Sequence, residues 1–290
     1  MKNALLLFSN QSGHGQFAAH EDTIVRALHR TFDEVDVVFT ASAEEGQKRA
    51  KEACGEYHSL IIVGGDGTFH NILNAVAEEK DIPIIGYINN GTIGDIGRNF
   101  GVTGSYKKAL KIIAGQHVMK ADVCKTGDRY FAYVAAVGSF ADIAYKAPRN
   151  RKQRLGKIAY YNMAVEQAFK KSKLNTTVYV DGVLYKKEVP FLMALNGRNI
   201  GGFAINKMGN MFDGKMELYL SNPGPFNGLL PYFFRRKKVV CLQGEHFHIK
   251  TDSDMAWCLD GEKGPVGELD IILKKGLIRV YVDPKIRKKM

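Results

Sequence analysis

Cysteine is scarce in this sequence, and its spacing excludes the common metal and redox motifs. The four cysteines lie far apart, and none belongs to a C-x-x-C pair. This spacing argues against a zinc site and against a thioredoxin-like motif. Isolated thiols are typical of buried side chains in a reducing compartment. We therefore expect a cytoplasmic protein that has no structural disulfides.

Long apolar runs are also absent. No stretch of the sequence reaches the roughly 18 apolar residues that a membrane-spanning helix needs. The apolar run at residues 4–8 is too short for the core of a signal peptide, and no cleavage site follows it. We therefore expect no transmembrane segment and no secretion signal.

Acidic residues are outnumbered by basic ones. The chain has 41 Lys and Arg residues but 30 Asp and Glu residues, which gives a formal net charge of +11. Such a charge favours an anionic partner, which could be nucleic acid, acidic lipid headgroups or a polyphosphate ligand, or it serves solubility alone; the charge by itself does not choose among these. No RRM, KH, zinc-finger or helix-turn-helix pattern is present, so we expect no nucleic-acid partner.

The first 120 residues alternate between two patterns. Buried apolar runs at residues 4–9, 35–40, 59–63 and 82–88 predict strands, and helical spacing follows the first three of them. This order predicts a Rossmann-like α/β nucleotide-binding domain over residues 1–120, with helices on both faces of a parallel sheet. Ligands bind such sheets at the carboxyl ends of the strands.

The pattern changes after residue 120. Short β-rich segments separated by Asp-Gly turns predict an antiparallel β-sandwich domain over residues 121–282, with one helix at 156–170. The tail at 283–290 could return to the first domain. We expect the active site in the cleft between the two domains.

The sequence GGDGT at residues 64–68 joins a buried strand to a helix. Glycines before a helix allow backbone N–H groups to approach an anion, so Gly64, Gly65, Gly67 and Thr68 suit a phosphate. Asp66 would repel that phosphate unless a metal ion or a hydroxyl stood between them, which indicates Mg²⁺-dependent phosphoryl transfer. The alternative is a simple turn in which Asp66 or Thr68 caps the helix.

A second loop, NNGTIGDIGR at residues 89–98, also follows a strand. Gly91 and Thr92 could donate to a phosphate, and Asp95 could hold metal-bound water. Arg98 could neutralise phosphate charge or pair with Asp95. Neither this loop nor the first is a P-loop or a spaced G-x-G-x-x-G fingerprint.

A third loop, SNQSGHG, follows the first predicted strand and offers Asn10, Ser12 and Gly13 at the same sheet edge. Three such loops at neighbouring strand ends match what a nucleoside triphosphate pocket needs.

The GGDGT motif at 64–68, followed by GT…D..R at 91–98, resembles the diacylglycerol kinase catalytic family, in particular its bacterial soluble lipid kinases. NAD kinases share GGDGT. The similarity to lipid kinases continues in order through segments 121–145, 195–220 and 259–264, which separates the two families.

This resemblance implies an ATP- and Mg²⁺-dependent lipid kinase that converts diacylglycerol to phosphatidic acid. Its nucleotide-binding residues would be Asn10, Ser12, Gly13, His14, Thr40, Gly64, Gly65, Gly67, Thr68, Thr92 and Arg98. Asp66, Asp95 and Asp122 would hold a water network around the catalytic Mg²⁺. Asp213 would bind a structural metal ion, helped by backbone oxygens near Asn210 and Lys215.

Glu262 would be the general base that takes the proton of the lipid hydroxyl, because a carboxylate in reach makes an alcohol a better nucleophile. The residue pattern alone makes Asp260-Gly261 a hairpin turn and Glu262 a surface acid. Only the resemblance gives Glu262 a catalytic role.

The sequence departs from the family pattern at Gln11, Asn71, Asn89 and Gly94. Two other functions therefore remain open. One is an NAD kinase-like enzyme that uses the same GGDGT loop. The other is a nucleotide-binding, membrane-associated regulator without turnover.

Two segments of the second domain are rich in basic residues. Residues 146–157 and 228–240 are rich in Arg and Lys, and the second is also rich in aromatic and aliphatic residues, which suits either a membrane surface or core packing. We expect peripheral membrane association, a lipid substrate at that surface and a homodimer. His246 and His248 alternate on a predicted strand and could form a two-His metal site.

Overall fold

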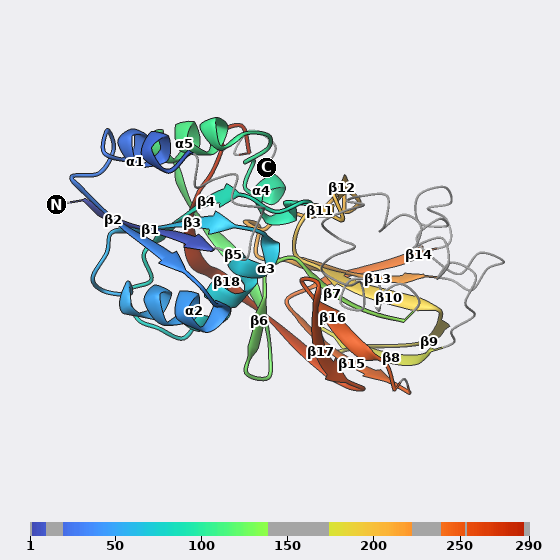
Figure 1. Cartoon of the computed structure of the whole chain (residues 1–290). Coiled ribbons are helices and arrows are strands. Elements are labelled where there is room, and N and C mark those ends of the chain that lie inside the picture. Colours follow the sequence, from blue (N-terminus) through green and yellow to red (C-terminus); the bar gives the residue numbers. More distant parts are fainter. Residues whose placement is uncertain (1, 10–19, 139–173, 222–238, 253, 287–290) are drawn as a thin grey trace. The chain divides into compact units, whose positions relative to one another are not determined.

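The computed structural model describes residues 2–9, 20–138, 174–221, 239–252 and 254–286 (Figure 1). The predicted helix at 156–170 therefore lies outside the described residues. The chain divides into two compact units: unit 1 consists of Met1–Val123 with Lys275–Met290, and unit 2 is Cys124–Lys274.

Both boundaries between the units fall inside a strand. One lies within β5 (Val118–Thr126), and the other lies within β18 (Leu269–Tyr281). The sequence pattern instead places the first boundary after residue 120. From the C-terminal part of the chain, it gives only residues 283–290 to the first domain. A strand that continues from one unit into the other keeps its strand pattern across the boundary, so the pattern does not mark the division.

Unit 1 is built on a parallel sheet. Its strands are β1 (Asn3–Ser9), β2 (Glu34–Thr40), β3 (Ser59–Gly64) and β4 (Ile84–Asn89), and they lie in the order β2-β1-β3-β4. Val280 of β18 continues the sheet by pairing in parallel with Ile85 of β4. β1, β3 and β4 are nearly continuous apolar runs because helices cover both faces of the sheet.

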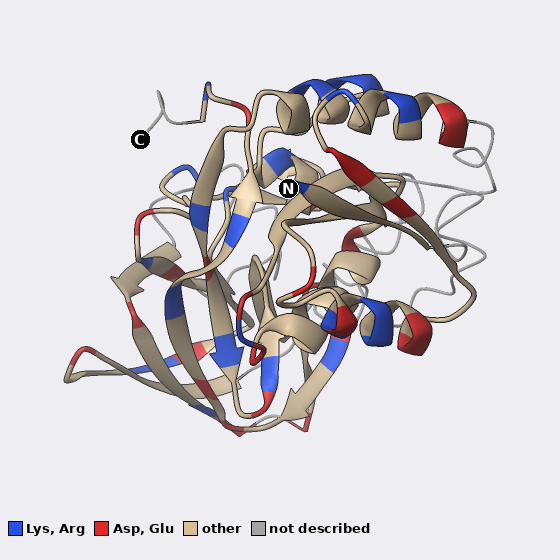
Figure 2. Cartoon of the chain, turned by 90° about the vertical axis from the view of Figure 1, so that its left-hand side faces the viewer, with Lys and Arg blue, Asp and Glu red and all other residues tan. Residues whose placement is uncertain are grey.

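Five helices accompany this sheet within the described residues. They are α1 (Glu21–Leu28), α2 (Ala43–Glu52), α3 (Asp66–Val76), α4 (Asp95–Asn99) and α5 (Tyr106–Ala114). α1 and α5 lie together on one face, and α2 and α3 lie together on the other (Figure 1). Acidic and basic residues both lie along the helices (Figure 2). The predicted α/β architecture is confirmed.

Unit 2 is antiparallel. One sheet has the order β14-β13-β10-β7-β16-β17, and a second one contains the first part of β18 followed by β15, β8 and β9. The strands of the first sheet are β7 (Val134–Gly138), β10 (Phe191–Leu195), β13 (Met216–Ser221), β14 (Val239–Gly244), β16 (Ala256–Leu259) and β17 (Glu262–Val266). The others in the unit are β6 (Arg129–Phe131), β8 (Leu174–Val180), β9 (Val183–Val189), β11 (Asn199–Ile200), β12 (Phe203–Ala204) and β15 (His246–Thr251).

The two sheets of unit 2 share one apolar core. Val178, Phe247 and Ile271 from the second sheet belong to the same buried cluster as Leu218 and Trp257 from the first. Alternate residues of β8 are buried, as expected when one face of a strand packs and the other meets solvent. The predicted β-sandwich is therefore confirmed.

No helix in the part of the chain that the structure describes is both long enough and apolar enough to cross a bilayer.

Trp257 is fully buried in this core, and its indole N–H donates to the backbone oxygen of Gly267 at 2.9 Å. We predict that Trp257→Ala lowers the free energy of unfolding by about 3–5 kcal/mol, because it leaves a large cavity. Urea denaturation measures this change. Val266→Ala, at an exposed position of the same hairpin, is the control and should shift stability by less than about 0.5 kcal/mol. Equal effects of the two substitutions would contradict this placement of Trp257.

Candidate active site

The GGDGT loop connects β3 directly to α3, and no side chain caps the N-terminus of this helix. The N-cap of α3 is Gly65, with φ −88° and ψ 179°, and no side chain caps it. The alternative in which Asp66 or Thr68 is the N-cap is therefore wrong, since both lie in the first turn of the helix. A Cβ atom at Gly64 would lie 2.6 Å from the Thr68 Cβ, so this corner accommodates only glycine.

The two glycine loops of unit 1 meet backbone to backbone. Gly64 and Asn89 are register partners at the ends of β3 and β4, and the backbone N–H of Asn90 donates to the Gly64 oxygen at 2.9 Å. A Cβ atom on Gly91 would lie 2.8 Å from the Gly65 Cα. The structure thus brings the loops at 64–68 and 89–94 together at one sheet edge.

Asp66 joins these loops by a contact that the sequence pattern does not reveal. Its Oδ2 accepts from the backbone N–H groups of Gly94 (3.0 Å) and Asp95 (3.1 Å), and its Oδ1 accepts from Ile96 (3.1 Å). Gly94 has a left-handed φ of +70°, which turns successive N–H groups toward one point at the start of α4. The carboxylate of the first loop therefore binds the N-terminus of the second loop's helix.

Asp95 lies close to Asp66 and is almost fully buried, with 2% of its surface exposed. The two acids also affect the pKa of Tyr87. Its pKa is raised well above the ordinary value, first by burial and then by the charges of Asp66 and Asp95, so its hydroxyl stays protonated. That hydroxyl donates to the Asn89 Oδ1 at 3.2 Å.

Asn89 is one of the positions where the sequence departs from the family pattern, and its side chain holds the second loop. Its Oδ1 accepts from the Gly91 N–H at 3.0 Å, and its Nδ2 donates to the Gly91 oxygen at 3.2 Å. Asn89 restrains this loop through hydrogen bonds on both sides of one peptide unit.

The remaining predicted nucleotide residues are less closely grouped. Thr40, at the end of β2, is buried and donates from Oγ1 to the Phe8 oxygen at 3.2 Å. Thr92 is exposed at the tip of the second loop. The Arg98 Nε donates to the Ile93 oxygen at 3.4 Å. Asn10, Ser12, Gly13 and His14 lie outside the described residues.

Asp122 is held by a different pair of strands. It lies on β5 with 3% of its surface exposed, and its Oδ1 accepts from the backbone N–H of Gly276 in β18 at 2.7 Å. The structure therefore brings Asp66 and Asp95 together, whereas Asp122 is positioned by β5 and β18.

Glu262 is the first residue of β17 and is exposed. Asp260 and Gly261 form the turn before it, with φ values of +50° and +94°, as the Asp-Gly pattern predicts. The sequence pattern gave Asp260 no further role. In the structure its buried carboxylate accepts from the backbone N–H groups of Ala132, Tyr133 and Val134, which fixes the turn to the segment between β6 and β7.

The predicted metal loop follows β12 in unit 2. Asn210 Oδ1 accepts from the Phe212 N–H at 3.2 Å, and Asp213 Oδ1 accepts from the Lys215 N–H at 3.1 Å. Asp213 and Lys215 are exposed. In the described part of the chain, no group of three or more His, Cys, Asp or Glu side chains is arranged to hold a metal ion.

A buried polar network lies next to this loop in the sequence, and the sequence pattern missed it. Glu217 is fully buried on β13 and accepts from Asn206 Nδ2 (2.6 Å) and Gln243 Nε2 (2.9 Å). Asn206 Oδ1 also accepts from the Tyr219 hydroxyl at 2.8 Å. A glutamate at an inward position of an otherwise apolar strand is the signal that could have indicated it.

We predict that Gly91→Ala destabilises the chain by about 1–3 kcal/mol, because its new methyl group would overlap the Gly65 backbone. Urea denaturation measures the change. The matched control is Gly46→Ala in the interior of α2, where a Cβ has ordinary contacts and should stabilise the helix by up to about 1 kcal/mol. A stabilising Gly91→Ala would disprove the close approach of the two loops.

We also predict a pH-dependent effect of Glu217, because burial raises the pKa of its carboxyl above the ordinary value of 4.5. The folded chain then binds this proton more tightly than the unfolded chain, so stability falls as pH rises from 4.5 through the folded pKa. Urea denaturation over a pH series should show this decline in the parent chain and its absence in Glu217→Gln. Glu34→Gln, at an exposed position, should keep the decline. Parallel pH profiles for the parent chain and Glu217→Gln would refute the prediction.

Comparison with known proteins finds diacylglycerol kinases. Residues 3–126 match the model of the diacylglycerol kinase catalytic domain. A diacylglycerol kinase of Staphylococcus carnosus (strain TM300) is 25% identical over 296 residues, which cover 99% of this chain and 97% of that protein. A diacylglycerol kinase of Staphylococcus aureus (strain MRSA252) is 26% identical over 273 residues, or 91% of this chain and 87% of that protein.

Solved structures show the same fold. A crystal structure of a diacylglycerol kinase from Bacillus anthracis strain Sterne superposes with a TM-score of 0.86 at 23% identity, and covers 98% of each chain. The match of residues 3–126 includes both glycine loops and Asp122, and the likeness to the staphylococcal kinases extends over unit 2. Residues 3–126 therefore match a diacylglycerol kinase catalytic domain, and the chain is similar over nearly its whole length to bacterial diacylglycerol kinases, which supports a lipid kinase.

Proposed function

We propose that this lipid kinase transfers the γ-phosphoryl group of ATP to the hydroxyl of diacylglycerol, gives phosphatidic acid and depends on Mg²⁺. The observation that carries the proposal is the contact between the two glycine loops, which brings the N-terminus of α3 and the glycine backbone of the second loop to one sheet edge. Helix N-termini and glycine backbones favour phosphate groups. The names of the related proteins supply the choice of diacylglycerol.

The nucleotide would lie along the sheet edge of unit 1. Backbone N–H groups at Gly65, Gly67 and Thr68 would donate to its phosphates, with Thr92 adding a hydroxyl and Arg98 a positive charge. Thr40 ends β2, which runs parallel to β3 and β4 on the far side of β1, so it would lie at the same edge. The predicted contacts from Asn10, Ser12, Gly13 and His14 would come from the loop after β1.

The hydrogen bonds of Asp66 bear on how it would serve Mg²⁺. A carboxylate offers about four lone-pair positions, and three backbone N–H groups already use three of those on Asp66. This carboxylate therefore suits a role in orienting metal-bound water better than direct coordination. Mg²⁺ retains several waters in kinase sites and neutralises charge on the transferred phosphate, so Asp66, Asp95 and Asp122 fit a surrounding water network.

The loop at Asn210–Lys215 fits a second, structural metal ion by its chemistry. Asp213 supplies a carboxylate, and the turn around it supplies backbone oxygens near Asn210 and Lys215. Such an all-oxygen set suits a hard divalent cation. The buried Glu217–Asn206 pair would hold the ends of this segment in place.

Glu262 would act as the general base. Its carboxylate would take the proton of the lipid hydroxyl as the oxygen attacks the γ-phosphate. The exposed position of Glu262 leaves it open to a substrate, while the three hydrogen bonds of Asp260 hold the turn that carries it. Rigid support of this kind keeps a base in reach of its proton.

We also propose that the kinase works at a membrane surface as a peripheral, cytoplasmic protein. The positive net charge of +11 supports attraction to acidic headgroups. The segment at 146–157 and most of 228–240 lie outside the described residues, so their contact with lipid stays a prediction. The homodimer also stays a prediction.

We predict that the purified chain, given labelled ATP and Mg²⁺, labels diacylglycerol in mixed micelles more than phosphatidylglycerol, a prenol or a sphingoid base. Glu262→Gln should lower kcat by about 10²–10⁴-fold, because it removes the base. ATP binding and the circular dichroism spectrum should not change. Glu34→Gln, an exposed acid on β2, is the matched control and should keep full activity.

Other outcomes would redirect the proposal. Formation of NADP that needs no detergent would indicate an NAD kinase-like enzyme. Binding of ATP without transfer to any lipid of the panel would indicate a regulator. Full activity of Glu262→Gln would remove Glu262 from the mechanism.

A further inference from the structure

The outer face of the β15–β18 pair in unit 2 carries two histidines and two acids that the kinase chemistry does not use. Along β15, Phe247 and Ile249 are buried in the core, while His246, His248 and Lys250 lie on the opposite face. This alternation follows from the two-residue period of a strand. His246 and His248 therefore project from the same side of the sheet.

The neighbouring strand places acids against these histidines. His248 and Asp270 are register partners, and His246 pairs with Ile272, which puts Asp270 diagonally across from His246. Glu268 lies two residues before Asp270 on the same face. Cross-strand and diagonal neighbours on one face are close enough for side chains to touch.

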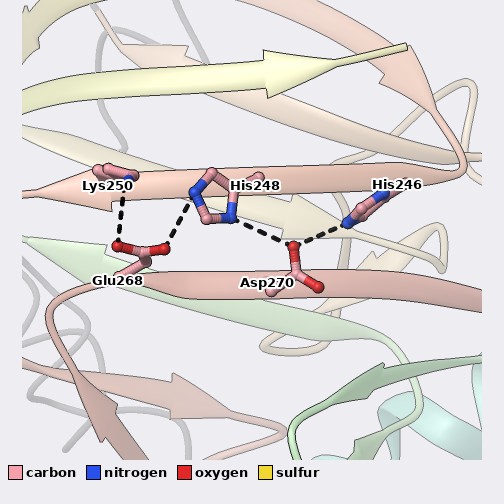
Figure 3. Close-up of polar contacts among 5 residues, drawn as sticks. All are labelled: His246, His248, Lys250, Glu268 and Asp270. Atoms are coloured by element: carbon pink, nitrogen blue, oxygen red, sulfur yellow. Dashed lines mark hydrogen bonds and ion pairs between the residues drawn. The ribbon is translucent and has the colours of Figure 1, made fainter. Parts of the chain in front are cut away.

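The contacts form one continuous chain of groups (Figure 3). His246 Nε2 lies 2.7 Å from Asp270 Oδ1, and His248 Nδ1 lies 3.3 Å from the same oxygen. The other ring nitrogen of His248, Nε2, lies 3.0 Å from Glu268 Oε1. Glu268 Oε2 is 3.4 Å from Lys250 Nζ. Two imidazole nitrogens thus converge on one carboxylate oxygen.

We propose that His246, His248 and Asp270 bind a divalent transition-metal ion of the zinc class, with Glu268 orienting His248. Zinc sites that keep an open position use three protein ligands from His and carboxylate side chains. A His-x-His pair on one strand with an acid across from it supplies this set from one sheet face. The ion would displace the protons that the three groups now share.

Glu268 gives this cluster a feature common in metal sites. A ligating imidazole almost always donates its second N–H to a carboxylate, which fixes the tautomer and the ring orientation. Here Nδ1 of His248 faces Asp270 and Nε2 faces Glu268, so each nitrogen already has a separate role. Asp270 can therefore serve as a ligand while Glu268 orients the His248 ring.

Binding requires a modest local adjustment. In the described part of the chain no group of three or more His, Cys, Asp or Glu side chains is already arranged to hold a metal ion. In this cluster, Asp270 Oδ1 contacts both imidazoles. The Asp270 side chain is 46% exposed, so its carboxylate can rotate toward an ion without disturbing the core. Metal–ligand distances of about 2.0–2.2 Å would then replace the hydrogen bonds.

The ligand chemistry separates this site from those proposed for Mg²⁺. Imidazole nitrogen prefers zinc, copper, nickel and related ions, whereas Mg²⁺ prefers oxygen. With neutral imidazoles, the two carboxylates outweigh the single ammonium group of Lys250, which leaves a local negative charge. Lys250 shares Glu268 with His248 and so competes for the acid that orients the ligand.

The test is a titration of the tag-free full chain with Zn²⁺, in excess Mg²⁺ to fill oxygen-rich sites, by calorimetry. The expected result is saturable binding of one ion per chain. His248→Gln and His246→Gln should each weaken binding by more than about 100-fold, since each removes a ligand. Glu268→Gln should weaken it by about 10–100-fold, as the loss of an orienting carboxylate does.

Three further measurements test whether the ion binds at this cluster. His29→Gln, an exposed histidine at the end of α1, should bind Zn²⁺ like the parent chain. Lys250→Gln keeps every ligand and should bind more tightly. Co²⁺ should give visible absorption that His248→Gln lacks, with circular dichroism confirming that each variant is folded. Absence of saturable Zn²⁺ binding, or binding that both His246→Gln and His248→Gln retain, would overturn the proposal.

Discussion

The binding of the Asp66 carboxylate by the N-terminus of α4 is the interaction on which the candidate site depends. It joins the loop after β3 to the loop after β4 through three backbone N–H groups. The two loops can meet this closely because Gly91 carries no side chain, since a Cβ atom there would lie 2.8 Å from the Gly65 Cα. A larger residue at Gly91, or loss of the acid, would separate the two loops that the proposed phosphate site needs.

Buried acids serve the same purpose elsewhere in the chain. Asp122 accepts from Gly276 across β5 and β18, and Asp260 accepts from three consecutive backbone N–H groups near β7. Burying a carboxylate costs free energy unless hydrogen bonds compensate it. These acids obtain that compensation from the backbone and fix loops in return, whereas Glu262 and Asp213 stay exposed, where a substrate or a metal ion can reach them.

The two units support different chemistry because their folds present different groups. The parallel sheet of unit 1 ends in helix N-termini and glycine backbones, which favour anions. The antiparallel sheets of unit 2 present alternate side chains to solvent, which lets a His-x-His pair and cross-strand acids gather on one face. Sheet type therefore decides whether a site is made from backbone N–H groups or from side chains.

The sequence by itself determined the architecture, the strand-end position of the glycine loops and the Asp-Gly turns, because apolar periodicity and turn residues act over a few neighbours. It did not reveal that Asp66 binds α4, that Asp260 holds the Glu262 turn, or that Asp270 faces His246 and His248. Those contacts join residues that are 28 positions apart for Asp66 and Gly94, and 22 apart for His248 and Asp270. Only strand register and loop packing bring such partners together, and one sequence does not record them.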